Sequence, residues 1–247
     1  MNGLGIVAAL AAESRPLGAT GRRDPGGHVT LADGTLLILS GVGLPGAAEG
    51  ANRLVAAGVR ALISWGMAGG LDPALVPGTL VLPHEVLSPE GRSFTTAADW
   101  RERVSAAIAT RHPVCGGRLL SCREALGSVA AKALAFRETA AVAVDMESSA
   151  VAEVAAARRL PFLAVRAIVD GAADELPTAA LQAVTAGTGT LRIGRLLAAL
   201  ARAPGELPSL IGLVGRYGSA RRALSAVARS GALAPQVVRD LPGGALT

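Results

Sequence analysis

The chain has 247 residues, a formal net charge of +5, 51% hydrophobic residues and only 2% aromatic ones. A chain of this length can bury the core of one large α/β domain or of two small ones. Its 31 glycines follow no fixed period, which excludes a collagen-like or low-complexity protein. The charge is uneven, because residues 189–247 contain eight arginines and two acidic residues, whereas residues 1–188 are close to neutral. A basic end of this kind indicates an anionic surface as a partner.

The cysteine and histidine positions do not indicate a metal site. Cys115 and Cys122 are separated by six residues, which matches no metal-binding spacing, and the three histidines are scattered. We therefore expect no metal and no cofactor. One pair of cysteines in a chain of this size favours free thiols in a reducing cytoplasm. Residues 1–12 are apolar but lack the positive segment of a signal peptide, and no uncharged apolar run is long enough to span a membrane.

Short apolar runs alternate with segments of helical periodicity along the chain. In chain order, we predict a strand at 4–11, a hairpin of strands 29–32 and 36–39, a helix at 47–57, strands at 61–65 and 80–86, a helix at 99–109, a strand at 118–121, a helix at 128–136, a strand at 140–144, a helix at 146–159, a strand at 161–170, and helices at 178–200 and 207–229. Residues 66–71 are interpreted as a turn and residues 88–96 as a polar loop. This alternation predicts a three-layer α/β domain.

Carboxylates stand where three of these strands end. Asp170 closes the apolar run 161–169, and Glu147 closely follows the strand 140–144. Ligands of open α/β sheets bind beyond the carboxyl ends of the strands, so both residues are candidates for a site. Asp170 could instead cap a helix or turn, and Glu147 could be a first-turn acid without a ligand. Glu13, after the first strand, can be read equally well as a site residue or as an acid that favours a helix N-terminus.

Two glycine-rich segments also follow predicted strands. Ser40-Gly41-Val42-Gly43 connects a strand to a helix, and such a turn can present backbone N–H groups to an anion or a water molecule. A glycine-rich motif of this kind is a weak signal by itself and could be no more than a tight turn. The segment 66–71 contains three glycines and Ala68, which leave room for a flat ligand.

Five motifs together resemble those of the nucleoside phosphorylase superfamily, in order from residue 4 to about residue 200. They are Gly5-Ile6-Val7 with Glu13, Ser40-Gly41-Val42-Gly43, Gly66-Met67-Ala68-Gly69-Gly70, Asp145-Met146-Glu147-Ser148 and Arg166-Ala167-Ile168-Val169-Asp170. The closest branch is the methylthioadenosine/S-adenosylhomocysteine nucleosidases. The arginine-rich end with Pro204-Gly205-Glu206-Leu207-Pro208 resembles the hopanoid-associated enzymes, which cleave adenine from adenosylhopane.

The resemblance implies a three-layer α/β/α fold, with a central mixed sheet flanked by helices. It divides the chain into a nucleoside phosphorylase-like domain at 1–203 and a basic helical extension at 204–247. It also implies a homodimer.

The resemblance further implies roles for the carboxylates. Asp170 would hold or donate a proton at purine N7, which requires burial to raise its pKa. Glu147 would stay ionised, bind the ribose hydroxyls and lie beneath the sugar cation, and Glu13 would orient and deprotonate the attacking water. Two carboxylates with divided roles are typical of glycoside-cleaving sites. The substrate-binding residues would be Met146 on the ribose, Ala68 and Gly69 along the adenine, and Ser40, Gly41 and Met67.

The sequence favours hydrolysis over phosphorolysis. Arginines suit phosphate because they bind it in a bidentate manner, yet neither 40–46 nor 66–71 contains one. Arg166 lies on a predicted strand and could face a phosphate, but a salt-bridge role is favoured. The alternatives are a phosphorolytic purine nucleoside phosphorylase, a methylthioadenosine/S-adenosylhomocysteine nucleosidase, and a nucleoside-binding protein without activity.

The substrate-binding motifs depart from the nucleosidase pattern at two places. Met67 replaces a common serine, and 123–126 lacks the aromatic neighbours of the purine. Both departures fit a large hydrophobic 5′ substituent, such as that of a hopanoid.

The basic helix 207–229 has two interpretations. It could lie on an anionic membrane, which would place a cytoplasmic enzyme at the inner membrane face, or it could pack on the body or on a second subunit. Because 204–247 contains a single aromatic residue, Tyr217, that could stack on bases, we expect no nucleic-acid partner.

Overall fold

The computed structural model describes residues 3–19, 24, 26–176 and 207–233. Within them, the strands are β1 (Leu4–Ala8), β2 (His28–Thr30), β3 (Leu36–Leu39), β4 (Ala61–Gly70), β5 (Leu80–Val81), β6 (Glu85–Leu87), β7 (Ser93–Thr95), β8 (Val114–Cys115), β9 (Arg118–Ser121), β10 (Ala141–Asp145) and β11 (Phe162–Asp170). The helices are α1 (Ala11–Ser14), α2 (Leu44–Ala56), α3 (Ala98–Ile108), α4 (Val129–Thr139), α5 (Ser148–Ala157) and α8 (Leu207–Arg229), with a 3₁₀ turn η1 (Arg15–Leu17).

The long strand β4 organises the sheet. Its first half pairs in parallel with β1, its other edge pairs in parallel with β11, and its far end pairs antiparallel with β10. The strand order is β2-β3-β1-β4-β10-β9-β6-β7, with β11, β5 and β8 branching from β4. The sheet is therefore mixed, and the carboxyl ends of β1, β10 and β11 meet around the second half of β4.

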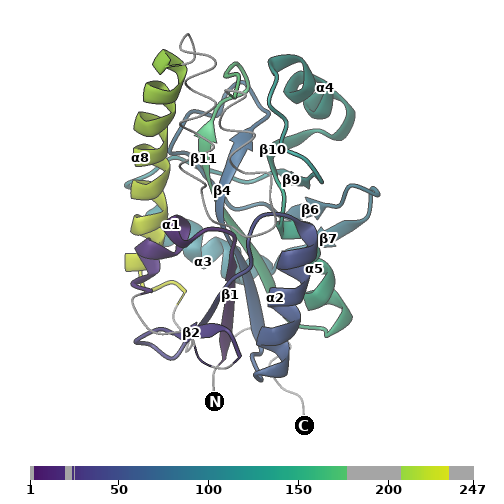
Figure 1. Ribbon diagram of the computed structural model, residues 1–247, viewed down its shortest axis with the longest axis vertical. Helices are drawn as coiled ribbons and strands as arrows, with labels where there is room; N and C mark the ends of the chain where they lie inside the picture. The colour runs from purple at the N-terminus through teal and green to yellow at the C-terminus, as the bar shows by residue number, and fades with distance from the viewer. Residues whose placement is uncertain (1–2, 20–23, 25, 177–206, 234–247) are drawn as a thin grey trace.

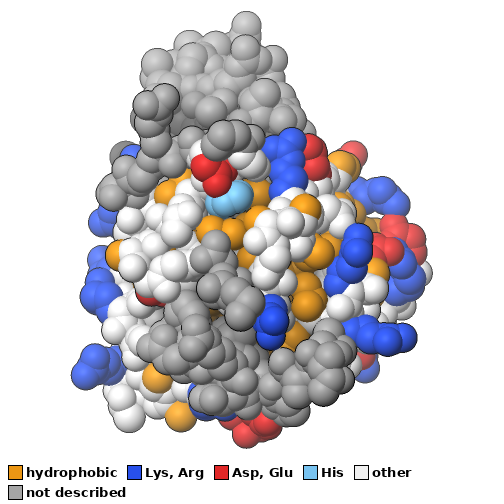
Figure 2. Space-filling model, turned by 90° about the horizontal axis from the view of Figure 1, so that it is seen from below, with side chains coloured by type: hydrophobic (Ala, Val, Ile, Leu, Met, Phe, Trp, Pro, Cys, Tyr) orange, Lys and Arg blue, Asp and Glu red, His pale blue; other side chains and the backbone are white. Residues whose placement is uncertain are grey.

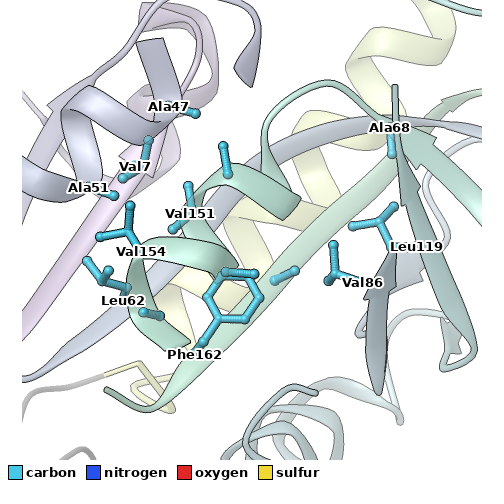
Figure 3. Packing of buried hydrophobic residues seen from close by; sticks show 14 of the residues in the cluster. Val7, Ala47, Ala51, Leu62, Ala68, Val86, Leu119, Val151, Val154 and Phe162 are labelled. Atoms are coloured by element: carbon cyan, nitrogen blue, oxygen red, sulfur yellow. The ribbon is translucent and has the colours of Figure 1, made fainter. Parts of the chain in front are cut away.

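Helices cover both faces of this sheet, which confirms the predicted α/β class and layer order. Figure 1 shows α8 along one side and α2 and α5 along the other. Successive side chains of β4 alternate between the two faces, as the pleat requires. Ile63 and Trp65 pack in the cluster that contains residues of α3 and α8, whereas Leu62 packs with Val151 and Val154 of α5 and Ala51 of α2 (Figure 3).

Several element boundaries differ from the sequence prediction. The turn expected at 66–71 is wrong, because β4 continues to Gly70 and pairs there with β10 and β11. These partners keep the glycines extended although glycine has little intrinsic preference for a strand. The strand expected at 80–86 is split into β5 and β6, which pair with different neighbours.

Further boundaries shift by a few residues. The loop expected at 88–96 contains β7, and the first strand stops at Ala8, before α1. The helix expected at 146–159 begins only at Ser148, which leaves Met146 and Glu147 in the connection. The helix expected at 178–200 lies outside the described residues.

Helix α8 packs against β11, η1 and α3. Ala220, Ala223, Leu224 and Val227 are fully buried in the same cluster as Trp65. The apolar face of this part of α8 is therefore occupied by the protein's own sheet, and Arg221, Arg222 and Arg229 are exposed. On the face of the molecule shown in Figure 2, most of the blue side chains lie towards the edges, several of them on the right beside acidic ones, and one lies near the middle. No described helix has both the length and the apolar character needed to cross a membrane.

Candidate active site

A cavity of about 210 Å³ opens where the carboxyl ends of β1, β10 and β11 meet β4. The ends of β4, β10 and β11 and the segments after β1 and β10 supply most of its wall, and the connections near 42, 125 and 176 also line it. The lining residues are Ala9, Leu10, Glu13, Val42, Met67, Ala68, Gly69, Ala125, Leu126, Val144, Asp145, Met146, Glu147, Val169, Asp170 and Leu176. The cavity thus combines an apolar wall with four carboxyl groups, which is typical of a small-molecule site.

Asp170 ends β11 and is 3% exposed. Its Oδ2 accepts a hydrogen bond from the ammonium group of Lys132, which comes from α4 and is fully buried. Burial raises the pKa of Asp170, and the charge of Lys132 acts in the opposite direction. On β4, a Cβ at Gly69 would lie 3.3 Å from Oδ2, so the glycine leaves room for this carboxyl group.

Glu147 lies at the N-cap position of α5 and is 7% exposed. The backbone N–H of Gly43 donates to its Oε1 at 3.0 Å, and Oε2 lies 3.7 Å from Nη2 of Arg166. Gly43 has a φ of 103°, a conformation that favours glycine. Burial raises the pKa of Glu147 to about 7, with further increases from Asp145 and Glu13 and a decrease from Arg166.

Glu13 is held by backbone N–H groups on both carboxyl oxygens. Met67 donates to Oε1 at 2.8 Å and Leu10 donates to Oε2 at 3.0 Å. A Cβ at Gly66 would lie 2.7 Å from Oε1, so only glycine admits the carboxyl group this close to β4. Burial also raises the pKa of Glu13. The carboxyl group acts as a helix-capping acid for α1 and lines the cavity at the same time, so the two readings of Glu13 are compatible.

Arg166 lies beneath the carboxyl groups and is 1% exposed. Its Nη2 contacts Oδ2 of Asp145 at 2.7 Å and donates to Oγ of Ser64 at 2.6 Å and of Ser148 at 3.0 Å. One guanidinium group therefore interacts electrostatically with the carboxyl groups of Glu13, Asp145 and Glu147. If all three were ionised, these four side chains together would carry a net charge of −2. Burial is the main reason why the pKa of Glu147 is raised, and the negative charges of Asp145 and Glu13 add to this effect.

Seven of the nine site residues expected from the sequence line this cavity, namely Glu13, Met67, Ala68, Gly69, Met146, Glu147 and Asp170. Ser40 and Gly41 lie outside it. The hydroxyl of Ser40 donates to the backbone oxygen of Gly41 at 2.8 Å, and Ser40 lines a separate hollow of about 70 Å³. The connection between β3 and α2, which contains Ser40 and Gly41, contributes to the site through Val42, which lines the cavity, and through the N–H of Gly43, which donates to Glu147.

Sequence reasoning missed two charged residues of the site. Asp145 accepts from Ser121 Oγ at 2.6 Å and from the N–H of Ser148 at 3.2 Å, and thereby fixes the start of α5. Lys132 holds Asp170. A signal for it was present, because it is the only lysine in the chain. Among the described residues, no group of three or more His, Cys, Asp or Glu side chains is arranged to hold a metal ion.

Glu147→Gln is expected to flatten the dependence of folding stability on pH. The folded protein keeps the Glu147 proton up to about pH 7, whereas the carboxyl group normally releases it near pH 4.5. Between these values the folded state binds more protons than the unfolded state, so the free energy of unfolding falls as pH rises. Glutamine has no such proton. Urea denaturation of both proteins at several pH values measures the slopes, and parallel curves would contradict the assignment.

The fold is similar to those of solved nucleosidases. The 5′-methylthioadenosine/S-adenosylhomocysteine nucleosidase from Neisseria meningitidis, in complex with methylthio-immucillin-A, has a TM-score of 0.66 at 18% identity, over 93% of this chain and 100% of that chain. A mutant of the Helicobacter pylori enzyme with 5′-methylthioadenosine in the active site has a TM-score of 0.66 at 17% identity, over 92% and 98%. Futalosine hydrolase of Helicobacter pylori has a TM-score of 0.65 at 20% identity, over 81% and 98%.

The sequence also matches a family directly. Residues 3–202 match the phosphorylase superfamily, a stretch that contains all the described residues of the cavity wall. Since this match spans most of the chain, the protein belongs to the phosphorylase superfamily.

Proposed function

We propose that this protein hydrolyses the N-glycosidic bond of an adenosine-type nucleoside and releases adenine. The observation that carries the proposal is the meeting of three buried carboxyl groups with raised pKa values, Glu13, Glu147 and Asp170, around one cavity. Raised pKa values in a cavity are typical of groups that exchange protons during catalysis.

Each carboxyl group has a part in this reaction. As the bond between C1′ and N9 breaks, its electron pair moves into the purine and the sugar acquires cationic character. Asp170, protonated, gives its proton to purine N7, which makes the base a better leaving group. Glu147 binds the ribose hydroxyls, and its ionised form stabilises the sugar cation. Glu13 takes the proton of the water molecule that adds to C1′.

The charge of the cavity supports water as the nucleophile. None of the lining residues within the described part of the chain is basic, and Arg166 lies beneath the carboxyl groups, bound to Asp145. A phosphate dianion would therefore meet Glu13 and Glu147 without a bidentate arginine partner. Phosphorolysis is the second candidate. It would need cationic groups at the place where the cavity presents the carboxyl groups of Glu13 and Glu147.

We further propose adenosylhopane as the substrate, and ribosylhopane as the second product. Ala125 and Leu126 line the cavity from the connection before α4, and the apolar Met67 lines it from β4. Aliphatic walls at these positions suit a nucleoside with a hydrophobic 5′ group, and the motif 204–208 resembles that of the hopanoid-associated enzymes. A methylthioadenosine/S-adenosylhomocysteine nucleosidase is the alternative.

The proposal includes a cytoplasmic homodimer with the basic extension 204–247 near anionic lipid. Because the apolar face of α8 is buried from Ala220 to Val227, this contact would rest on exposed arginines such as Arg221 and Arg222. An electrostatic contact of this kind weakens with salt. Co-sedimentation with anionic vesicles should accordingly fall at high ionic strength, and salt-independent pelleting would contradict it.

Mass-spectrometric product analysis tests the proposed substrate. Adenosylhopane and methylthioadenosine are offered separately, and in competition, at equal concentration. We expect adenine from both and a higher kcat/KM for adenosylhopane. A preference for methylthioadenosine would favour the alternative, and the absence of adenine with either would remove the nucleosidase proposal.

A further inference from the structure

Lys132 is the only lysine of the chain and is fully buried. It is also the only residue of α4 that is fully buried, whereas Leu134 on the same helix is 45% exposed. A helix normally faces the core with apolar side chains and leaves lysine in water. A lysine that points into the core from a helix that otherwise lies at the surface therefore indicates a specific function.

The ammonium group of Lys132 donates its hydrogen bonds at the end of the cavity where Asp170 lies. It donates to Oδ2 of Asp170, to the backbone oxygen of Gly171 at 2.9 Å and to that of Asp174 at 2.8 Å. Three N–H groups thus meet one carboxylate oxygen and two carbonyl oxygens. A buried cation needs this full set of partners, because burial without them is costly.

The other charged groups near Asp170 are already paired. Asp174 accepts from the N–H of Gly171 at 2.8 Å and from Nη1 of Arg216, on α8, at 2.7 Å. Among the described residues, Lys132 is therefore the cation in direct contact with the Asp170 carboxyl group. Asp174 and Arg216 act on it from farther away and with opposite signs.

We propose that Lys132 is the positioning residue of the acid: its ammonium group fixes Oδ2 of Asp170, leaves Oδ1 to carry the proton to the purine, and neutralises the carboxylate that remains. This inference rests on the proposed function of Asp170. When Oδ1 gives its proton to N7, a negative charge appears in a buried site, and a preorganised ammonium group stabilises it without rearrangement. Without Lys132, burial would raise the pKa of Asp170 further, and the acid would hold its proton too tightly.

The pH profile of kcat/KM for adenine release distinguishes this role from a purely structural one. For Lys132→Met, we expect kcat to fall at least about tenfold and the alkaline limb of the profile to move to higher pH, because the pKa of Asp170 rises. Lys132→Arg, which keeps the charge, should retain the wild-type limb. Ser128→Ala is the matched control. It removes the hydroxyl that caps α4 by accepting from the N–H of Ala131, so it loosens the same helix without removing any hydrogen bond of the Lys132 ammonium group.

Two outcomes would overturn the proposal. One is a Lys132→Met enzyme with the wild-type limb and kcat. The other is a shift of the limb in Ser128→Ala as large as that in Lys132→Met, since loosening of the helix would then explain both.

A spectroscopic measurement tests the pairing even where Lys132→Met does not fold. Because the chain has one lysine, ¹⁵N-lysine labelling gives a single side-chain ammonium signal. Its shift should titrate with Asp170 in the wild-type protein between about pH 4 and about pH 9 and lose this step in Asp170→Asn. A step that persists in Asp170→Asn, or no step in the wild type, would overturn the pairing. Failure of the wild type to release adenine would instead remove the proposed function, which this signal does not measure.

Discussion

Asp170→Asn is expected to lower kcat for adenine release by about 10²–10⁴-fold, the usual contribution of a general acid. Asparagine has nearly the same shape but has no proton of suitable acidity for purine N7. Because Asp170 contacts the base and the rest of the cavity wall is unchanged, KM should rise only as far as the weaker binding of adenine requires. Steady-state kinetics with chromatographic detection of adenine measures both constants, and a variant within tenfold of the wild-type kcat would contradict the role of Asp170.

This substitution needs a folding control, because it leaves the buried Lys132 without its carboxylate. Removal of one partner of a buried ion pair costs about 3–5 kcal/mol, whereas removal of both is often close to neutral. The double variant Asp170→Asn with Lys132→Met should therefore regain thermal stability and remain inactive. Recovery of activity together with stability would show that the loss in the single variant came from misfolding.

Glu13→Gln is expected to lower kcat by about 10²–10⁴-fold through a different step, since glutamine cannot take a proton from water. Its amide oxygen can still accept one of the two hydrogen bonds that Met67 and Leu10 donate to the carboxylate. The position of α1 should therefore be kept, and so should binding of adenine, which isothermal titration calorimetry measures.

The contrast between the two variants is informative. Asp170→Asn removes a group at the base, so it should weaken adenine binding, whereas Glu13→Gln should not. If Glu13→Gln retained wild-type turnover, the attacking water would have another base, and the division of roles among the carboxyl groups would be wrong.

Much of this fold could be predicted from local sequence. β1, β3, β10 and β11 are short apolar runs, and a sheet buried on both faces requires such runs. The outer half of β4 could not be predicted, because Gly66, Gly69 and Gly70 have a turn-like composition. Their backbone is extended because it pairs with β10 and β11. The residues are glycines because a Cβ at Gly66 or Gly69 would crowd the carboxyl group of Glu13 or Asp170.

The candidate site was predictable to a similar extent. Glu147 and Asp170 follow predicted strands, and strand ends of an α/β sheet are where ligands bind. The position of Ser40 outside the cavity could not be predicted, because a glycine-rich turn does not show which way its side chains point. Lys132 was missed because a lysine within a helix normally faces solvent, and its contact with Asp170 joins residues 38 positions apart.

Adenine release in phosphate-free buffer tests the central claim most directly. Mass spectrometry of the products shows whether the sugar has gained a hydroxyl group or a phosphate. The arrangement of Glu13, Glu147 and Asp170 predicts full turnover without phosphate, a free sugar product and no acceleration when phosphate is added. Strict dependence on added phosphate, with a sugar 1-phosphate as product, would contradict it.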